Sequence, residues 1–166
     1  DVELTSMHGA SLRLFVSASK IVQPSVRRML AKERTLGLGK LSTYQAFAKR
    51  VVKNQKALRA LLLDLRKRNK KIVGYGAPAK GNTLLNSIGI DHTTVDFIID
   101  TTPFKQGLFA PGSHIPVYHP DTFRPFQPHY ALLLAWNYAD AILEKEKAMR
   151  DRGVKFILPV PQVRIL

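Results

Sequence analysis

The sequence predicts an α/β protein with a Rossmann-like, doubly wound and mainly parallel sheet of about five strands, preceded by a strand and two helices. From Lys71 onward, short apolar runs alternate with helical segments, which is typical of parallel strand pairing. The run at residues 72–75 leads directly into glycines. The run at residues 130–136 is unbroken, as expected of a strand that is covered on both faces.

The first 70 residues predict one strand and two helices. Residues 11–16 alternate apolar with small or charged side chains, which indicates a short strand. Residues 18–33 carry apolar side chains at helical spacing, and Pro24 stands near the start. Ser42 is the candidate N-cap of a long helix from Thr43 to about Arg68. Its apolar positions predict one buried stripe, formed by Phe47, Val51, Leu58, Leu62 and Leu65.

The rest of the chain predicts the sheet and its covering helices. We expect strands at 72–75, 95–100, about 115–118, 130–136 and 155–160. We expect helices at 80–87, ended by Gly89, and at 139–152, ended by Gly153. The polar segment from 101 to 113 is long for a loop in a compact domain, and such loops often contact ligands.

The formal net charge of +14 is unevenly distributed along the chain. Residues 1–71 contain 17 Lys and Arg against 4 Asp and Glu, whereas residues 72–166 contain 9 against 8. A basic segment suggests a nucleic-acid-binding module, a solvated helix face or a docking surface for an acidic domain. No recognised nucleic-acid motif accompanies the charge, so nucleic acid is the least favoured partner.

The composition excludes several kinds of site and segment. There are no cysteines, which excludes disulfides and thiolate metal sites and fits a reducing compartment. The five histidines show no metal-ligand spacing, and the sequence contains no recognised nucleophile motif. No apolar run approaches the roughly 20 residues that span a bilayer, and no secretory leader follows Asp1. We therefore expect a cytoplasmic piece of a longer protein, with no membrane partner, no metal and no catalytic residues of its own.

A glycine turn follows the strand at 72–75 and matches the G-x-G-x-x-A form of the dinucleotide fingerprint. In that motif Gly74 allows the tight turn, Gly76 lets the backbone approach a phosphate, and Ala79 allows the helix to pack closely on the sheet. The start of the following helix favours an anion. Lys80, Asn82 and Thr83 add a positive charge and hydrogen-bonding groups there. The alternative is a tight turn without a ligand.

Other polar residues follow the carboxyl ends of neighbouring strands. Asp100 either accepts hydrogen bonds from a ribose or caps the turn that follows it. Lys105 is either a phosphate ligand or an ordinary solvated lysine, and Gln106 and His114 are candidates for binding sugar hydroxyls. Asn137 is either a ligand-binding amide or only the N-cap of the next helix. These residues predict a site for a phosphate-bearing ligand, and an NAD(P)-binding oxidoreductase domain is one alternative.

Several ordered motifs resemble one enzyme family. Residues 74–83, GYGAPAKGNT, are similar to the signature turn in the C-terminal domain of bacterial SAM-dependent sugar C-methyltransferases, which methylate C3 of nucleotide-linked 4-keto sugars. Four further segments match in order: DTTPFKQG at 100–107, PGSHIP at 111–116, LLLAWN at 132–137 and FILPVP at 156–161. Upstream, HGASLR at 8–13 is similar to the stretch that ends the family's methyltransferase domain, with Ala10 in place of a glycine.

The resemblance implies three parts and a division of labour. Residues 1–17 would end a SAM-binding domain, residues 18–70 would form a basic helical linker, and residues 71–166 would form a domain that binds a nucleotide sugar, with dTDP as the expected carrier. SAM and zinc would bind domains that precede this chain, which would not methylate alone. The candidate substrate-binding residues are Gly74, Tyr75, Gly76, Ala77, Ala79, Lys80, Gly81, Asn82, Thr83, Asp100, Lys105, Gln106, His114, Trp136 and Asn137.

Overall fold

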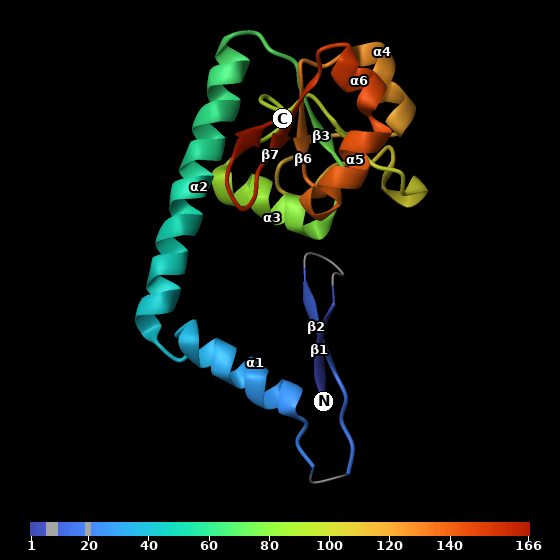
Figure 1. Ribbon diagram of the computed structural model, residues 1–166. Helices are drawn as coiled ribbons and strands as arrows, with labels where there is room; N and C mark the ends of the chain where they lie inside the picture. Colours follow the sequence, from blue (N-terminus) through green and yellow to red (C-terminus); the bar gives the residue numbers. More distant parts are fainter. Residues whose placement is uncertain (6–9, 19–20) are drawn as a thin grey trace. The chain divides into compact units, whose positions relative to one another are not determined.

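The computed structural model describes residues 1–5, 10–18 and 21–166, which form two compact units, Asp1–Val51 and Val52–Leu166. Figure 1 shows both units, with the long helix α2 (Leu41–Lys67) contributing to each. His8 and Gly9, which belong to the upstream motif, lie outside the described residues. No helix of the described ranges is both long and apolar enough to cross a membrane.

The first unit contains a hairpin and a helix. Strands β1 (Val2–Thr5) and β2 (Ser11–Leu14) pair antiparallel, so the strand expected at 11–16 is present but shorter, and β1 was not predicted. Helix α1 (Pro24–Thr35) begins at its proline rather than at residue 18. Proline suits the first turn of a helix because it has no N–H group that would need a partner there.

The second unit confirms the predicted fold class. Its sheet has the order β5-β4-β3-β6-β7-β8, in which the first five strands are parallel and β8 is antiparallel to β7. The strands are β3 (Ile72–Tyr75), β4 (Ile98–Ile99), β5 (Val117–Tyr118), β6 (Tyr130–Leu133), β7 (Lys155–Leu158) and β8 (Arg164–Ile165). The central strands β3 and β6 are fully or almost fully buried, as their apolar runs predicted.

Helices cover both faces of this sheet (Figure 1). On one face α2 and α3 (Ala79–Ile88) pack through Leu58, Leu62 and Leu85 against side chains such as Ile72 and Leu132. On the other face lie α4 (Phe123–Phe126), α5 (Ala139–Lys145) and α6 (Lys147–Asp151). Short 3-10 turns occupy Pro103–Lys105, Pro120–Thr122 and Trp136–Tyr138.

The predicted stripe on α2 is only partly correct. Leu58, Leu62 and Leu65 are buried, but Phe47 is 56% exposed because the first half of the helix does not belong to the sheet unit.

Two of the basic side chains on α2 make specific contacts within the fold. Arg59 donates to the carbonyls of Ile88 and Gly89 (2.6 and 2.8 Å) and so binds the negative end of α3.

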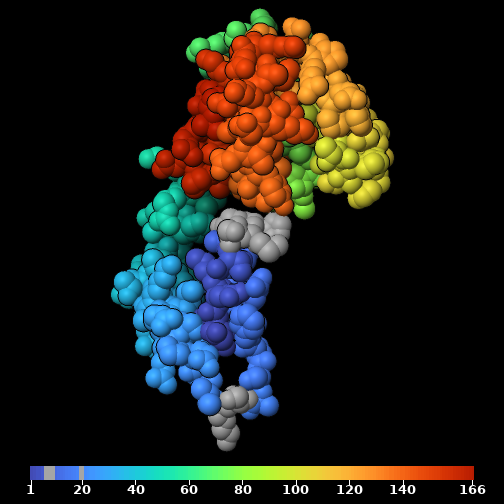
Figure 2. All heavy atoms as spheres, turned by 45° about the vertical axis from the view of Figure 1, so that its right-hand side comes forward, coloured from blue at the N-terminus to red at the C-terminus, as the bar shows by residue number. Residues whose placement is uncertain are grey.

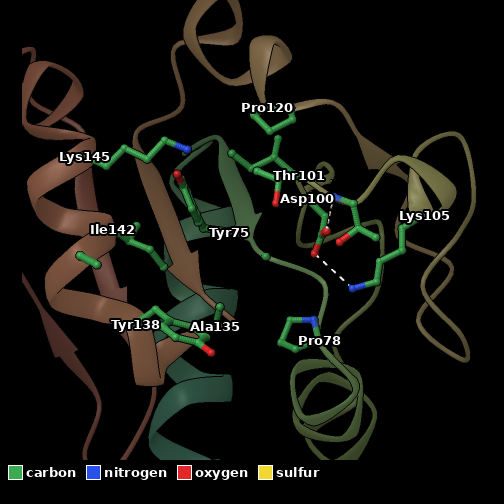
Figure 3. A pocket seen from close by; sticks show the side chains of 14 residues that line it. Tyr75, Pro78, Asp100, Thr101, Lys105, Pro120, Ala135, Tyr138, Ile142 and Lys145 are labelled. Carbon is green, nitrogen blue, oxygen red and sulfur yellow. Dashed lines mark hydrogen bonds and ion pairs between the residues drawn. The ribbon is translucent and has the colours of Figure 1, made fainter. Parts of the chain in front are cut away.

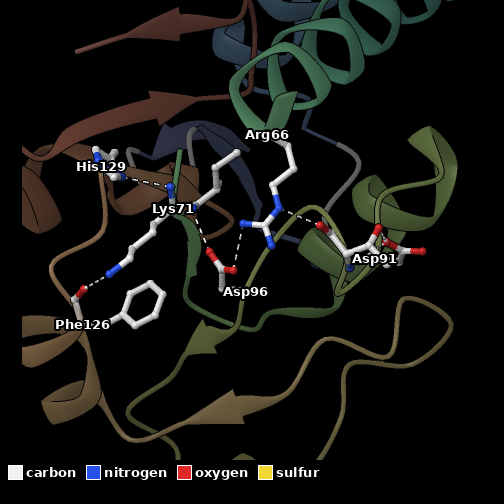
Figure 4. Close-up of polar contacts among 8 residues, drawn as sticks. Arg66, Lys71, Asp91, Asp96, Phe126 and His129 are labelled. Carbon is white, nitrogen blue, oxygen red and sulfur yellow. Dashed lines mark hydrogen bonds and ion pairs between the residues drawn. The ribbon is translucent and has the colours of Figure 1, made fainter. Parts of the chain in front are cut away.

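Arg66 holds the C-terminal end of α2 to the sheet (Figure 4). It donates to the carbonyl of Thr93 at 2.8 Å and pairs with Asp96 at 3.0 Å. The second carboxylate oxygen of Asp96 accepts the backbone N–H of Ile72, also at 3.0 Å, at the start of β3. These contacts lie at the amino end of the central strand, so part of the basic segment serves the fold rather than a partner.

Candidate functional site

The strand order fixes where a ligand can meet this sheet. The chain runs from β3 to β4 and β5 on one side and then crosses to β6 on the other side of β3. In open α/β sheets, ligands bind beyond the carboxyl ends of the strands at such a reversal. The glycine turn leaves β3 at that edge, and Asp100 and Trp136 follow β4 and β6 at the same edge (Figure 3 shows part of it).

The glycines of the turn pack closely against neighbouring strands, and Gly74 does not make the tight turn that the sequence predicted for it. Gly74 lies inside β3, and a Cβ there would stand 2.8 Å from Cγ1 of Ile98. Gly76 makes the turn, with φ 82°, and its added Cβ would lie 2.8 Å from Cβ of Ala135. Ala79 is exposed, so the close approach of helix to sheet occurs instead at Gly81, where an added Cβ would be 2.9 Å from Cβ of Leu134.

Asp100 fastens the glycine turn to the loop that follows β4. Its two carboxylate oxygens accept the backbone N–H groups of Ala77 (2.7 Å) and Thr102 (2.8 Å). Lys105 donates to the carbonyl of Ala77 at 3.1 Å and lies 3.5 Å from the Asp100 carboxylate, while Gln106 donates to the Asp100 carbonyl at 2.9 Å. Asp100 therefore caps the following turn, one of its two predicted roles, and ribose binding stays a prediction.

The Asp100 carboxylate is held in its charged form by these contacts. Burial by itself would raise its pKa. The hydrogen bonds from Thr102 and from the Ala77 N–H, together with the charge of Lys105, outweigh burial and lower the pKa below its ordinary value. Lys105 thus has an anionic partner within the fold.

Lys80, Trp136 and Asn137 come together on the other side of the turn. The Lys80 ammonium lies 4.5 Å from the centroid of the Trp136 ring and donates to the side-chain oxygen of Asn137. Burial lowers the pKa of Lys80. The sequence predicted all three residues separately, and the fold joins them because α3 starts beside the segment that leaves β6.

The remaining candidate residues make other contacts. The Tyr75 hydroxyl donates to the buried carboxylate of Glu146 at 2.7 Å, and burial followed by this contact raises the Tyr75 pKa. Thr83 is exposed and donates to the carbonyl of Ala79 one turn back. His114 is exposed with a left-handed backbone (φ 52°) and does not line the pocket described next. Asn82 has a buried side-chain oxygen without a partner among the described residues.

A pocket of about 440 Å³ opens at this edge, over the ends of β3, β4 and β6 (Figure 3). Of the predicted residues, Tyr75, Gly76, Asp100 and Lys105 line it. Residues that the sequence analysis missed complete the lining: Pro78, Ile99, Thr101, Thr102, Pro120, Ala135, Tyr138, Ala141, Ile142 and Lys145. The spacing of 138, 141, 142 and 145 places these side chains on one helical face, a signal that was available in the sequence.

The pocket joins apolar walls with cationic groups. Ile99, Pro120 and Ile142 offer apolar surface, and Lys105 and Lys145 come from opposite sides, as Figure 3 shows. In the space-filling view, the loop after β4 (yellow) and helices α5 and α6 (orange) lie on neighbouring parts of the surface (Figure 2). Within the described ranges, no three His, Cys, Asp or Glu residues are placed to hold a metal ion. The arrangement suits an organic anion with an apolar portion.

Comparison with known proteins gives two matches. A family model described as the C-methyltransferase C-terminal domain matches residues 6–161. The chain is also similar to the C-methyltransferase NovU of Streptomyces niveus, with 40% identity over 169 residues. That alignment covers 100% of this chain and 40% of NovU, so the chain spans about two fifths of the length of this relative. Both matches agree with the resemblance carried by the motifs.

Proposed function

Because the chain belongs to the family of C-methyltransferase C-terminal domains, we propose that it holds the substrate of a longer, SAM-dependent C-methyltransferase. The substrate is a nucleotide-linked keto-deoxysugar, with dTDP as the carrier. This domain anchors the nucleotide and its diphosphate, and the enzyme works in the cytoplasm. The observation that carries the proposal is the pocket at the strand reversal, where apolar walls and lysines meet.

The pocket has the size and chemistry for part of a nucleotide. Its volume of about 440 Å³ lies within the usual range of small-molecule sites. Apolar side chains can pack on a base, and the exposed ring of Tyr138 at the edge offers a surface for stacking. Residues 72–166 are almost neutral in sum, yet Lys105 and Lys145 line the pocket and Lys80 stands in the first turn of α3, next to the same glycine turn. A diphosphate would complement them.

The chemistry of methyl transfer belongs to domains that precede this chain. In the proposed reaction a base there removes the proton next to the keto group, and the resulting enolate carbon takes the methyl group that SAM supplies. This chain contributes a fixed position for the sugar, because a held substrate reacts faster than a diffusing one. Exposed apolar side chains of the first unit, Leu4, Leu12, Leu14, Leu41 and Phe47, support the presence of a covering partner domain.

Calorimetric titration of the chain with dTDP tests the proposal. We expect saturable binding, and we expect no methylated product when the chain alone is incubated with SAM and a dTDP-keto sugar. Absence of binding even at millimolar dTDP would contradict the assignment of a nucleotide site to this domain.

The fingerprint keeps NAD(P) as a second candidate, but the turn disfavours it. The N–H of Gly76 donates to the carbonyl of Ile99 (2.7 Å), and the N–H of Ala77 donates to Asp100. Backbone donors and the acid that a dinucleotide would use are thus engaged within the fold. Titration with NADH should leave its fluorescence unchanged. A gel-shift assay addresses the nucleic-acid alternative, for which we expect no salt-sensitive shift of duplex or single-stranded DNA.

A further inference from the structure

The two lysines beside the glycine turn are in different electrostatic states. Lys105 forms an ion pair with Asp100 and donates to the carbonyl of Ala77. Lys80 is in none of the ion pairs among the described residues. Its two partners, the Trp136 ring and the Asn137 side-chain oxygen, carry no formal charge. Of these two lysines, Lys80 is therefore the one whose charge is not neutralised within the fold.

The surroundings of Lys80 disfavour the charged form of its side chain. The side chain is partly buried, and burial lowers its pKa. It also stands in the first turn of α3, at the end of the helix that carries a partial positive charge. Neutral partners hold the ammonium at the strand reversal without cancelling its charge, which is the arrangement expected of a cation that receives an anionic ligand.

We infer that Lys80 binds the diphosphate of the ligand, that Asn137 and Trp136 position its ammonium, and that Lys105 instead closes the glycine turn. This inference rests on the proposed function, since it divides the roles within the nucleotide-sugar site. Asn137 is suited to positioning because its amide oxygen orients the ammonium and leaves the positive charge available. An aspartate at the same place would orient the lysine equally well but would neutralise it.

Four variants of the 166-residue chain test this division: Lys80→Met, Asn137→Asp, Lys105→Met and Lys155→Met. The last is the matched control, because Lys155 is an exposed lysine at the amino end of β7, away from the carboxyl edge. Binding of dTDP is measured by calorimetry, inorganic pyrophosphate is used as a competing probe, and thermal unfolding reports stability.

We expect Lys80→Met and Asn137→Asp each to weaken dTDP binding by about 10- to 100-fold, which is the usual contribution of a charge-assisted hydrogen bond to affinity. In both variants pyrophosphate should lose its ability to compete. Both should melt no lower than the wild-type chain, because Lys80→Met removes a partly buried charge and Asn137→Asp gives Lys80 an ion-pair partner. Lys105→Met should lower the melting temperature and change dTDP affinity less than Lys80→Met, and Lys155→Met should match the wild-type chain in both measurements.

The outcomes distinguish failure of the proposed function from failure of the role assigned to Lys80. If the wild-type chain does not bind dTDP, the proposed function fails. If the wild-type chain binds dTDP and Lys80→Met or Asn137→Asp binds equally well, the nucleotide site stands and the role of Lys80 is wrong. Stronger loss of binding in Lys105→Met than in Lys80→Met would likewise overturn the division of roles.

Discussion

At the scale of single residues, Asp100 links the stability of the second unit to pH. Its pKa is lower in the folded chain than its ordinary value of about 3.9, so the unfolded state takes up a proton first as the pH falls. The stabilising contribution is therefore complete above that value and is lost as the pH drops through the lower, folded pKa. We expect Asp100→Asn to reduce the free energy of unfolding near pH 7 by about 1–3 kcal/mol, because the charged acceptor of two N–H groups is removed.

Urea denaturation of both proteins between pH 7 and pH 3 measures this effect. The difference between wild type and Asp100→Asn should stay constant above about pH 5 and shrink below about pH 4. A difference that persists unchanged at pH 3 would mean that shape rather than charge accounts for the contribution of Asp100.

Single residues also show what sequence reasoning could and could not find in the site. The contact among Lys80, Trp136 and Asn137 was predictable because the carboxyl ends of parallel strands share one edge. Substrate binding by these residues stays a prediction. The direction of a loop side chain has no such rule, so the sequence could not tell whether His114 lines the pocket. His114 does not line it, and neither do Lys80, Trp136 and Asn137. The helical spacing of Lys145 with residues 138, 141 and 142 was visible in the sequence, but that this face lines the pocket depends on where α5 packs over the sheet.

At the scale of elements, the contact between α3 and the sheet depends on Gly81. Replacement of an exposed helical glycine by alanine usually stabilises a protein by up to about 1 kcal/mol. Here the added Cβ would lie 2.9 Å from Cβ of Leu134, the residue that follows β6. Helix α3 would therefore have to move away from the sheet. We expect Gly81→Ala to destabilise the chain by about 1–3 kcal/mol, as measured by denaturant unfolding.

Gly39→Ala is the matched control, since nothing lies within 4 Å of an added Cβ at Gly39. It should leave the melting temperature almost unchanged. A Gly81→Ala variant as stable as the control would show that α3 adjusts its position without cost.

Elements differ in how far the sequence could predict them. The long apolar runs became the buried strands β3 and β6, because burial on both faces leaves a strong pattern. The missed elements β8 and α4 are only 2 and 4 residues long, too short to show a period. The helix expected at 139–152 divides at Glu146, whose buried carboxylate accepts the Tyr75 hydroxyl, a contact 71 residues apart in the sequence.

At the scale of the whole molecule, the pocket and the core beneath it lie in residues 52–166. The buried side chains of both core clusters come from residues 58–158, and the pocket is lined by residues 75–145. A chain shortened to residues 52–166 should therefore fold cooperatively and bind dTDP with a Kd within about twofold of the full chain, as expected for distant, independent parts. Circular dichroism and calorimetry measure the two properties. The deletion also removes nine Lys and Arg against three Asp and Glu, so any affinity for DNA should fall while dTDP binding persists. A shortened chain that folds but no longer binds dTDP would show that the first unit supplies contacts to the nucleotide.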